Sequence, residues 1–431
     1  MLDSMRRVDS NASEYTGAKG FRRVDYVKIT IFGFALAALW SSLHGIILPV
    51  RLLDFVAEPQ KNTYLGLLTF AGLILAMAVQ PTAGAISDRS GFSWGRRRPY
   101  ILVGAILAIL FISGMGFAGS YIAIFVIYCL LQVSSNTAQG PWQGFIPDMV
   151  PGEKRGLASG VKGLFELLGS IVVLRLIIAP FMNRYFTGEG SSWLWLALGA
   201  LAVVMLGVMI ATVLTVKERP GVGGAQLPSL STLHKSFKID VKAQPNFIPF
   251  LVSRLLFLMP LVIITTFGLY FLQDFVGVAN PVTATADLIV AAGASMLVVV
   301  YPAGRLSDKI GRRPVAIVAA FIGALGIVLL YFFPSYGYIM LAGSFLGISY
   351  GAFTSANWAL ATDLVTRGEE ARYLGLVNLA TAGASALARL IGPVIDFFNA
   401  YSAGLGYSVM LLACFVFFIV SAILLLRIKA R

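Results

Sequence analysis

Charged residues are scarce in this chain. Asp, Glu, Lys and Arg make up 12% of its 431 residues, whereas a soluble domain carries roughly a quarter. Hydrophobic residues make up 58% and form long runs, many of which reach the ~20 residues that a helix needs to cross a bilayer. The ~10-residue alternating segments of a membrane β-barrel do not occur. The composition therefore predicts an all-α membrane protein with many spans.

Residues suited to catalysis and metal binding are also few. The chain has two cysteines and two histidines, and both Cys129 and Cys414 lie inside apolar runs, where packing is their expected role. The sequence has no Gly-rich phosphate loop, no ATPase motif and no nucleophile with a base at a usable spacing. We therefore expect no enzyme activity, no cofactor and no metal site. The N-terminal tail lacks the apolar stretch of a cleaved signal peptide.

Positive charge outweighs negative charge, with 33 Lys and Arg against 20 Asp and Glu. Most of these basic residues fall in the two tails and in every second loop, whereas only Arg51, Lys61 and Arg184 lie near the opposite face. This asymmetry follows the positive-inside rule and predicts that both termini are cytoplasmic, in a bacterial inner membrane. The basic excess therefore predicts membrane topology and contact with lipid, and no nucleic-acid partner.

The apolar runs predict twelve transmembrane helices, divided six and six by the longest loop. The expected spans are 27–50, 63–86, 99–118, 121–146, 157–182, 192–216, 247–274, 284–306, 314–333, 337–362, 373–398 and 403–427. The predicted organisation is an N-terminal cytoplasmic tail (1–26), a six-helix bundle (27–216), a cytoplasmic central loop (217–246) and a second six-helix bundle (247–431). We expect the chain to be a monomer.

The two halves repeat one charged loop motif. The stretch from Gly84 to Pro99 contains G-A-I-S-D-R and G-R-R-R-P, and a second version runs G-R-L-S-D-K-I-G-R-R-P from Gly304 to Pro314. In addition, Arg175 precedes Pro180 in the fifth span, and Arg389 precedes Pro393 in the eleventh. Parallel repeats of this kind are typical of transporters whose solute site lies at the interface of the halves. The sequence therefore predicts two pseudo-symmetric bundles.

The chain resembles a major facilitator superfamily transporter along essentially its whole length. The duplicated loop motif is the most specific part of this resemblance. The longer first copy, through Trp94–Ile101, and the stretch Asn136–Pro141 are similar to the sucrose transporters and their glycoside–pentoside–hexuronide symporter relatives. This narrower likeness covers roughly the first 150 residues. The resemblance implies the superfamily fold and alternating access to a central site.

The resemblance also implies a gating role for the two loops. Asp88 would contact the eleventh span and Asp308 the fifth, because helix N-termini and arginines are good partners for a carboxylate. The alternative is that the arginines only fix topology and bind lipid headgroups. The residues with the implied gating role are Asp88, Arg89, Arg96, Arg97, Asp308, Arg312 and Arg313.

Glu166 is the one carboxylate that we place near the middle of the membrane. A buried carboxylate that changes protonation with conformation is suited to proton coupling. The alternative is a structural pair with Lys162, one helical turn away. Arg51 and Asp54 are expected to form an interfacial pair, although an outer gate is an open alternative. Arg175 and Arg389 are expected to hold their helices, and the alternative is that they neutralise an anionic solute.

Amide and aromatic side chains cluster in the fourth, seventh and tenth spans. Amides suit the hydroxyl groups of a sugar, and aromatic faces suit its C–H faces. The alternative is that the amides only join neighbouring helices. The predicted solute-binding residues are Gln132, Asn136, Gln139, Trp142, Gln143, Tyr270, Gln273, Tyr350, Asn357 and Trp358.

Two positions depart from the sucrose–proton symporters, which carry an Asp where this chain has Gln132 and an Arg where it has Gln143. Loss of both charges together leaves no unpaired buried ion. Coupling would then use Glu166, with a proton or another cation, or the protein would be a uniporter. We therefore expect a secondary active or facilitative carrier of a small polar solute, with a sugar or glycoside favoured. The alternatives are efflux of amphipathic compounds, or a non-transporting factor for pigment delivery or complex assembly.

Overall fold

The computed structural model describes residues 22–218, 246–364 and 370–428. This part of the chain contains twelve helical spans long and apolar enough to cross a membrane, which confirms the predicted fold class. The spans are Arg23–Leu52, Glu58–Ser87, Arg98–Phe117, Tyr121–Met149, Gly152–Phe186, Ser192–Thr215, Phe247–Val276, Pro281–Ile310, Arg312–Phe332, Tyr336–Ala361, Gly375–Asn399 and Leu405–Arg427. Most of the predicted tail and central loop lies outside the described residues.

The first six spans build one bundle. Its α-helices are α2 (Arg23–Thr30), α3 (Phe32–Ser42), α4 (Leu48–Leu52), α5 (Lys61–Ser87), α6 (Arg98–Phe117), α7 (Tyr121–Gln143), α8 (Phe145–Met149), α9 (Arg155–Leu168), α10 (Ala179–Phe186) and α11 (Ser192–Thr215). Two π-helical segments, η1 (Leu43–Ile47) and η4 (Gly169–Ile178), continue the first and fifth spans, and the short 3₁₀ turns η2 (Glu58–Gln60) and η3 (Gly152–Lys154) begin the second and fifth. Glu58 and Gly152 therefore start these spans earlier than expected.

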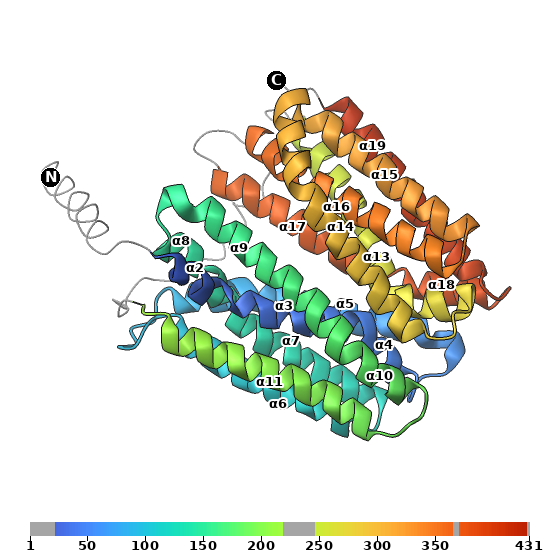
Figure 1. The fold of residues 1–431 in the computed structure, drawn as a ribbon, viewed down its shortest axis with the longest axis horizontal. Coiled ribbons are helices and arrows are strands. Elements are labelled where there is room, and N and C mark those ends of the chain that lie inside the picture. The colour runs from blue at the N-terminus through green and yellow to red at the C-terminus, as the bar shows by residue number, and fades with distance from the viewer. Residues whose placement is uncertain (1–21, 219–245, 365–369, 429–431) are drawn as a thin grey trace, which may run out of the picture.

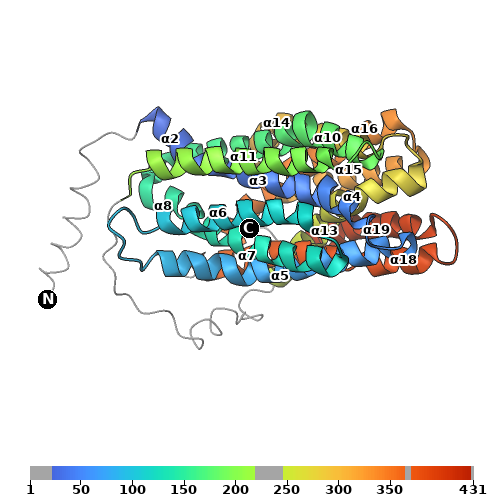
Figure 2. The ribbon, with the colours of Figure 1, turned by 90° about the horizontal axis from the view of Figure 1, so that it is seen from below.

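The last six spans build the other bundle (Figure 1). Its elements are α13 (Phe247–Phe271), η5 (Leu272–Val276), α14 (Pro281–Ile310), α15 (Arg312–Phe332), α16 (Tyr336–Leu364), α17 (Glu370–Arg389), α18 (Gly392–Asn399) and α19 (Leu405–Arg427). Within the halves, α7 packs on α5 and α6, and α16 packs in the same way on α14 and α15. Figure 2 shows the long helices of both halves running in nearly the same direction.

The two bundles meet at one end and diverge toward the other. In Figure 1 they lie together where α4, α10 and α18 are, and separate toward the end that carries α2 and α8. At the closed end α5 packs against α17 and α18. Glycine permits this approach, because a Cβ at Gly66 would collide with the carbonyl oxygen of Arg389, and a Cβ at Gly392 with that of Asn62.

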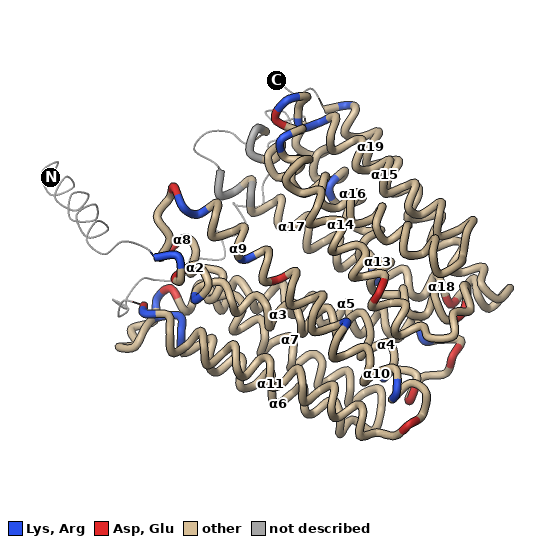
Figure 3. Tube along the Cα trace, viewed as in Figure 1, with Lys and Arg blue, Asp and Glu red and all other residues tan. Residues whose placement is uncertain are grey.

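Basic side chains are concentrated at the diverging end of the molecule. Figure 3 shows Lys and Arg gathered around α2 and α8 and near the end of α19, whereas the closed end carries several acidic residues. The charge asymmetry read from the loops therefore corresponds to a physical asymmetry between the two ends of the bundles.

Candidate functional site

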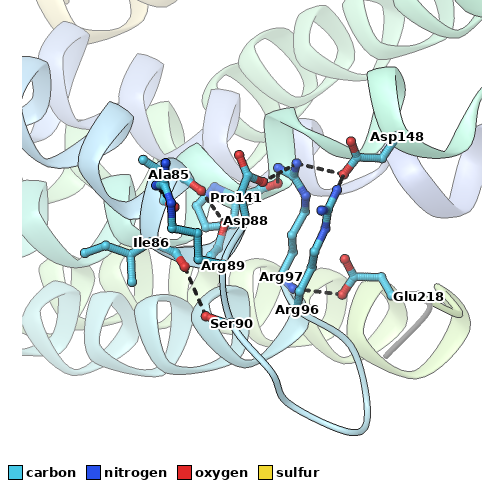
Figure 4. Close-up of polar contacts among 12 residues, drawn as sticks. Ala85, Ile86, Asp88, Arg89, Ser90, Arg96, Arg97, Pro141, Asp148 and Glu218 are labelled. Carbon is cyan, nitrogen blue, oxygen red and sulfur yellow. Dashed lines mark hydrogen bonds and ion pairs between the residues drawn. The ribbon is translucent and has the colours of Figure 1, made fainter. Parts of the chain in front are cut away.

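The first loop motif forms an ion-pair cluster within its own half (Figure 4). Arg97 Nη2 lies 2.6 Å from Asp88 Oδ1 and 2.7 Å from Asp148 Oδ2, and Arg96 also pairs with Asp148. Arg89 donates to the carbonyl of Ala85 at 2.8 Å. Asp88 is thus engaged by its own bundle while its side chain remains half exposed. Contact between Asp88 and the eleventh span stays a prediction, since residues 365–369 are outside the described part.

Glu218 caps the helix that follows the loop. The backbone N–H groups of Arg97 and Arg98 donate to Glu218 Oε2 at 3.0 and 2.9 Å, at the N-terminus of α6, where the helix dipole favours an anion. Burial raises the pKa of the Glu218 carboxyl above its ordinary value, although these two N–H groups act to lower it. Gly95 makes the tight turn with φ of +128°, and a Cβ there would also collide with Glu218.

The arginines of the two motifs make matching contacts. Arg97 donates to the carbonyl of Pro141 at 2.9 Å, and Arg312 donates to that of Ala359 at 2.5 Å. In the same way, Arg98 donates to the carbonyl of Val213 and Arg313 to that of Leu426. The acceptors lie in the fourth, sixth, tenth and twelfth spans. These arginines therefore hold corresponding helix ends together in both halves, a structural role that the gating prediction did not include.

The second loop borders an open hollow. Asp308 is exposed and lines a space of about 770 Å³ together with Arg312 and Arg313. Its motif glycine, Gly311, also has a positive φ, of +98°, which explains why glycine precedes the arginine pair in both copies. Contact between Asp308 and the fifth span stays a prediction.

A cavity of about 400 Å³ lies between the halves. Most of its lining comes from the N-terminal bundle, and α14 contributes one residue. The lining residues are Leu36, Ala37, Trp40, Gln139, Trp142, Gly163, Glu166, Leu167, Ser170 and Met296. The structure thus brings together three of the predicted residues, Gln139, Trp142 and Glu166. Trp40, which faces the same space, was not predicted.

The predicted pair between Lys162 and Glu166 is present, with Nζ 3.5 Å from Oε1. Lys162 Nζ also lies 5.0 Å from the centre of a Trp142 ring, and the indole N–H of Trp142 donates to the carbonyl of Ile29 at 2.9 Å. Trp142 is only 2% exposed and packs edge to face on Phe32, so it supports the cavity wall and presents neither its N–H group nor an open ring face. Glu166 is both a cavity residue and a member of an ion pair, so both interpretations of it remain.

A buried polar chain runs beside the cavity. His44 Nε2 lies 2.8 Å from the hydroxyl oxygen of Tyr128, which accepts from Gln132 Nε2 at 2.7 Å. Asn136 Nδ2 donates to Gln132 Oε1 at 3.1 Å, and the ring of Trp40 stacks on His44 with centroids 5.2 Å apart. The amide bonds of Gln132 and Asn136 lie within α7, and the bond between Tyr128 and His44 is the one in this polar chain that joins two helices. Solute binding by Gln132 and Asn136 stays a prediction.

The C-terminal half contributes a buried cation that the sequence reading overlooked. Arg254 donates from Nε to Thr381 Oγ1 at 2.9 Å and from Nη1 to Asn357 Oδ1. Its guanidinium lies 5.8 Å from the centre of a Trp358 ring. Arg254 therefore contacts two predicted residues of α16, whereas Tyr350 of the same helix is partly buried against the core. Its position inside the seventh predicted span was the signal available in the sequence.

The other predicted solute residues lie elsewhere. Gln143 is exposed and accepts from Gln80 Nε2 at 2.9 Å. Tyr270 is buried at the closed end, where its hydroxyl donates to the carbonyl of Pro49 at 2.7 Å. Gln273 lies in η5, one residue before Asp274, and its Oε1 is buried without a hydrogen-bond partner. The structure does not bring these three residues to the cavity.

The closed end is held by polar contacts between the halves. Lys61 Nζ lies 2.8 Å from Asp274 Oδ1, and the hydroxyl of Tyr407 donates to Asp274 Oδ2 at 2.6 Å. Asp396 accepts from Asn62 Nδ2 at 2.8 Å and from the backbone N–H of Thr63 at 2.6 Å. We call these residues the outer network. Carboxylates near span ends were visible in the sequence, but their partners were not.

A second bridge between the halves joins Arg175 to Asp287, which also accepts from the Tyr336 hydroxyl at 2.7 Å. Arg175 therefore holds its helix against the opposite bundle. The predicted pair of Arg51 and Asp54 is present at 2.5 Å, within one half.

Comparison with known proteins agrees with this architecture. The family model described as MFS/sugar transport protein matches residues 33–430. The rice (Oryza sativa subsp. japonica) sucrose transport protein SUT1 is 28% identical over 200 residues, covering 37% of this chain and 35% of its own length. An uncharacterized symporter, YnaJ of Bacillus subtilis, is 25% identical over 315 residues, covering 69% of this chain and 65% of its own.

Two solved structures show the same fold. The nucleoside transporter NupG superposes with a TM-score of 0.70 at 15% identity, covering 94% of this chain and 99% of that one. A bacterial homologue of the human lysosomal transporter Spinster superposes with a TM-score of 0.69 at 16% identity, covering 95% and 97%. The matched region spans about a third of the length of the rice sucrose transport proteins. These relatives and structural neighbours are transporters, not enzymes.

Proposed function

Because the chain belongs to the MFS/sugar transport protein family, we propose that it is a secondary active or facilitative carrier that moves a small polar solute by alternating access. The observation that carries the proposal is the cavity between the halves, closed at one end by the outer network. A solute held between two bundles whose described polar contacts gather at one end can leave by the other.

The conformation described is, in this proposal, inward-facing. The end of the bundles rich in Lys and Arg (Figure 3) would be cytoplasmic by the positive-inside rule, in the inner membrane of a bacterium. The outer network would then close the periplasmic side, and the half-exposed Asp88 would belong to a cytoplasmic gate that is open. The carrier would work as a monomer whose apolar outer surface contacts lipid.

A sugar or glycoside is the solute class that the cavity favours. Trp40 offers an aromatic face, and Gln139 offers an amide in the wall that Glu166 also lines. This combination suits a ring with hydroxyl groups on its edge and C–H groups on its faces. The rice relatives are named for sucrose transport, which supports the same class.

Glu166 is the residue to which we assign coupling. It lines the cavity and its only ion-pair partner among the described residues is Lys162, at 3.5 Å. Protonation of Glu166 would release Lys162 and change the charge of the cavity wall. The symporter name of the Bacillus subtilis relative supports a coupled mechanism.

Solute counterflow in proteoliposomes tests the function. Vesicles that contain the purified protein are loaded with unlabelled solute and challenged with labelled mono- and disaccharides, glycosides and amphipathic cations. We expect counterflow of at least one sugar or glycoside that disappears when the outer network is locked by a Thr63–Asp396 double-cysteine cross-link and returns on reduction.

Two outcomes would contradict the proposal. Counterflow of amphipathic compounds alone would indicate efflux. Absence of counterflow for every solute, from protein that retains its helix content and thermal transition, would favour a non-transporting membrane factor.

A further inference from the structure

In the part of the C-terminal half that the structure describes, two guanidinium groups are buried without a carboxylate partner. Arg254 is 8% exposed and Arg389 is 6% exposed, yet neither lies within 4 Å of an Asp or Glu in the described residues. Lys61, Lys162 and Arg175, in contrast, each have an acidic partner. An isolated charge removed from water costs several kcal/mol, so these two cations require compensation from another source.

Neutral groups orient Arg254 without cancelling its charge. Its Nε donates to the Thr381 hydroxyl at 2.9 Å, and its Nη1 donates to the Asn357 amide oxygen. The ring of Trp358 lies beside the guanidinium, 5.8 Å from centroid to Cζ. The amide nitrogen of Asn357 is itself buried without an acceptor. Arg254 and the Asn357 amide thus present N–H donors side by side, and the described residues supply no anionic acceptor for them.

The surroundings of Arg254 place it beside the solute path. Asn357 is the counterpart of Gln139 in the other half. The matched arginine contacts make Pro141 of α7 equivalent to Ala359 of α16. Gln139 and Asn357 each lie two residues before these equivalent positions. Gln139 lines the cavity together with Leu36 of the first span, and Asn357 contacts Arg254 of the first span of the other half.

Arg389 supplies a second unpaired charge toward the closed end. It donates to the carbonyl of Ser385 in its own helix, and its Nε is buried without a partner. Among the described residues, the C-terminal side of the interface thus carries two buried guanidinium groups with no carboxylate within 4 Å.

We propose, on the basis of the transport function above, that the solute carries a carboxylate or phosphate group and that Arg254 binds this group, with Arg389 as a second positive charge along its path. Guanidinium forks match the planar oxygens of carboxylates and phosphates, and the anion would also accept from Asn357. The sugar ring would lie toward Trp40. A sugar acid or a sugar phosphate has both parts.

The test compares matched solutes in proteoliposomes. Glucose, gluconate, glucuronate and glucose 6-phosphate differ in charge but share a six-carbon skeleton and hydroxyl groups. We expect the wild-type protein to give counterflow of at least one anionic member with a half-saturation at least about 10-fold lower than that of glucose, the gain of one charge-assisted contact. Preference for gluconate or glucuronate identifies a carboxylate, and preference for glucose 6-phosphate identifies a phosphate.

Variants assign the preference to Arg254. Arg254→Gln should lower the anionic preference, measured as the ratio of the half-saturation for glucose to that for the anionic solute, by about 10-fold or more. Arg254→Lys should retain part of this preference. The matched control is Arg184→Gln, which removes an exposed cation that stacks on Trp193 at the closed end.

The inference and the proposed function fail differently. Counterflow of neutral sugars with no anionic preference, or an anionic preference that Arg254→Gln leaves intact, overturns the inference and leaves the transport function standing. Silence toward all four solutes and the wider sugar panel overturns both. If Arg254→Gln does not fold, the wild-type comparison still tests the charge of the solute, and Arg254→Lys tests the residue that binds it.

Discussion

Lys61 of α5 lies 2.8 Å from Asp274 of η5, and this contact joins the two halves of the molecule. The Lys61 side chain is 4% exposed and that of Asp274 is 27% exposed. Asp274 has a second partner, the Tyr407 hydroxyl at 2.6 Å, whereas Asp274 is the one carboxylate paired with Lys61 in the described part of the chain. The pair is therefore asymmetric, and its two single substitutions should differ in effect.

Asp274→Asn should open the closed end more than Lys61→Met does. The Asn variant leaves a nearly fully buried ammonium without a counter-charge, which costs about 3 kcal/mol, or roughly a 100-fold shift in population, when a buried pair loses one partner. Lys61→Met leaves Asp274 partly solvated and bonded to Tyr407. Accessibility of a cysteine placed at Gln273 to an impermeant thiol reagent measures the opening from outside.

The double variant provides the control for this prediction. Lys61→Met combined with Asp274→Asn removes both charges, so closure should recover relative to Asp274→Asn alone. Equal accessibility in all three variants would mean that the pair does not contribute to closure.

Gly66→Ala should prevent close contact between α5 and α17. A Cβ at Gly66 would collide with the backbone carbonyl oxygen of Arg389, which has no rotamer that relieves the clash. Overpacking of this kind costs about 1–3 kcal/mol, so we expect counterflow to fall by about 10-fold or more. Gly160→Ala, in α9, is the matched control because a Cβ there meets no atom within 4 Å. A similar loss in both variants would indicate a general effect of alanine.

The sequence predicted the fold well because span length and the repeated loop are local features. Apolar runs define helices through the thickness of the bilayer, and the two motif copies fix the relation of the halves. Most differences lie at helix ends, where short 3₁₀ turns such as Glu58–Gln60 extend the spans.

The site was predicted only in part, because the sequence of a single span does not show which of its faces turns toward the cavity. Gln139 and Trp142 are three residues apart and share the face that lines the cavity, whereas the neighbouring Gln143 points to Gln80. Lys61 and Asp274 were not paired in advance, since they are far apart in the chain and meet only when two bundles close. Arg254 was overlooked because its significance depends on the lack of a nearby carboxylate in the described residues, and a sequence does not show which side chains surround a residue.

Asp88→Asn should increase the inward-facing population. Asp88 now pairs with Arg97 of its own half at 2.6 Å, and the predicted cytoplasmic latch would use the same carboxylate in the other state. The substitution also removes the pair with Arg97, but the Asp88 side of that pair is half exposed and the pair contributes little, whereas loss of the latch should destabilise the inward-closed state by about 1.5–3 kcal/mol for a charged hydrogen bond. Labelling of a cysteine at Gly163, in the cavity, from the cytoplasmic side measures the change, and Glu153→Gln is a control at an exposed loop. Unchanged labelling would remove Asp88 from the gate.

Glu218 should make stability depend on pH. Burial raises the pKa of its carboxyl in the folded protein, so the folded state binds this proton more tightly than the unfolded chain, whose glutamate pKa is about 4.3. The stabilising contribution is therefore full below about pH 4 and is lost as pH rises through the folded pKa. Thermal unfolding in detergent should show the wild-type protein losing stability over this interval relative to Glu218→Gln. A constant difference between the two proteins across the interval would exclude the effect.

Glu166→Gln should separate coupling from binding. If Glu166 carries the coupling proton, the variant loses uphill uptake driven by a proton gradient, because the amide cannot change charge, and it retains counterflow, which needs no net proton movement. Lys162→Met is the informative partner variant, since it breaks the 3.5 Å pair but keeps the carboxylate. A structural pair predicts that both variants lose counterflow together. A coupling role predicts that Lys162→Met retains uphill uptake with an altered pH optimum, because the nearby ammonium no longer favours the ionised carboxylate.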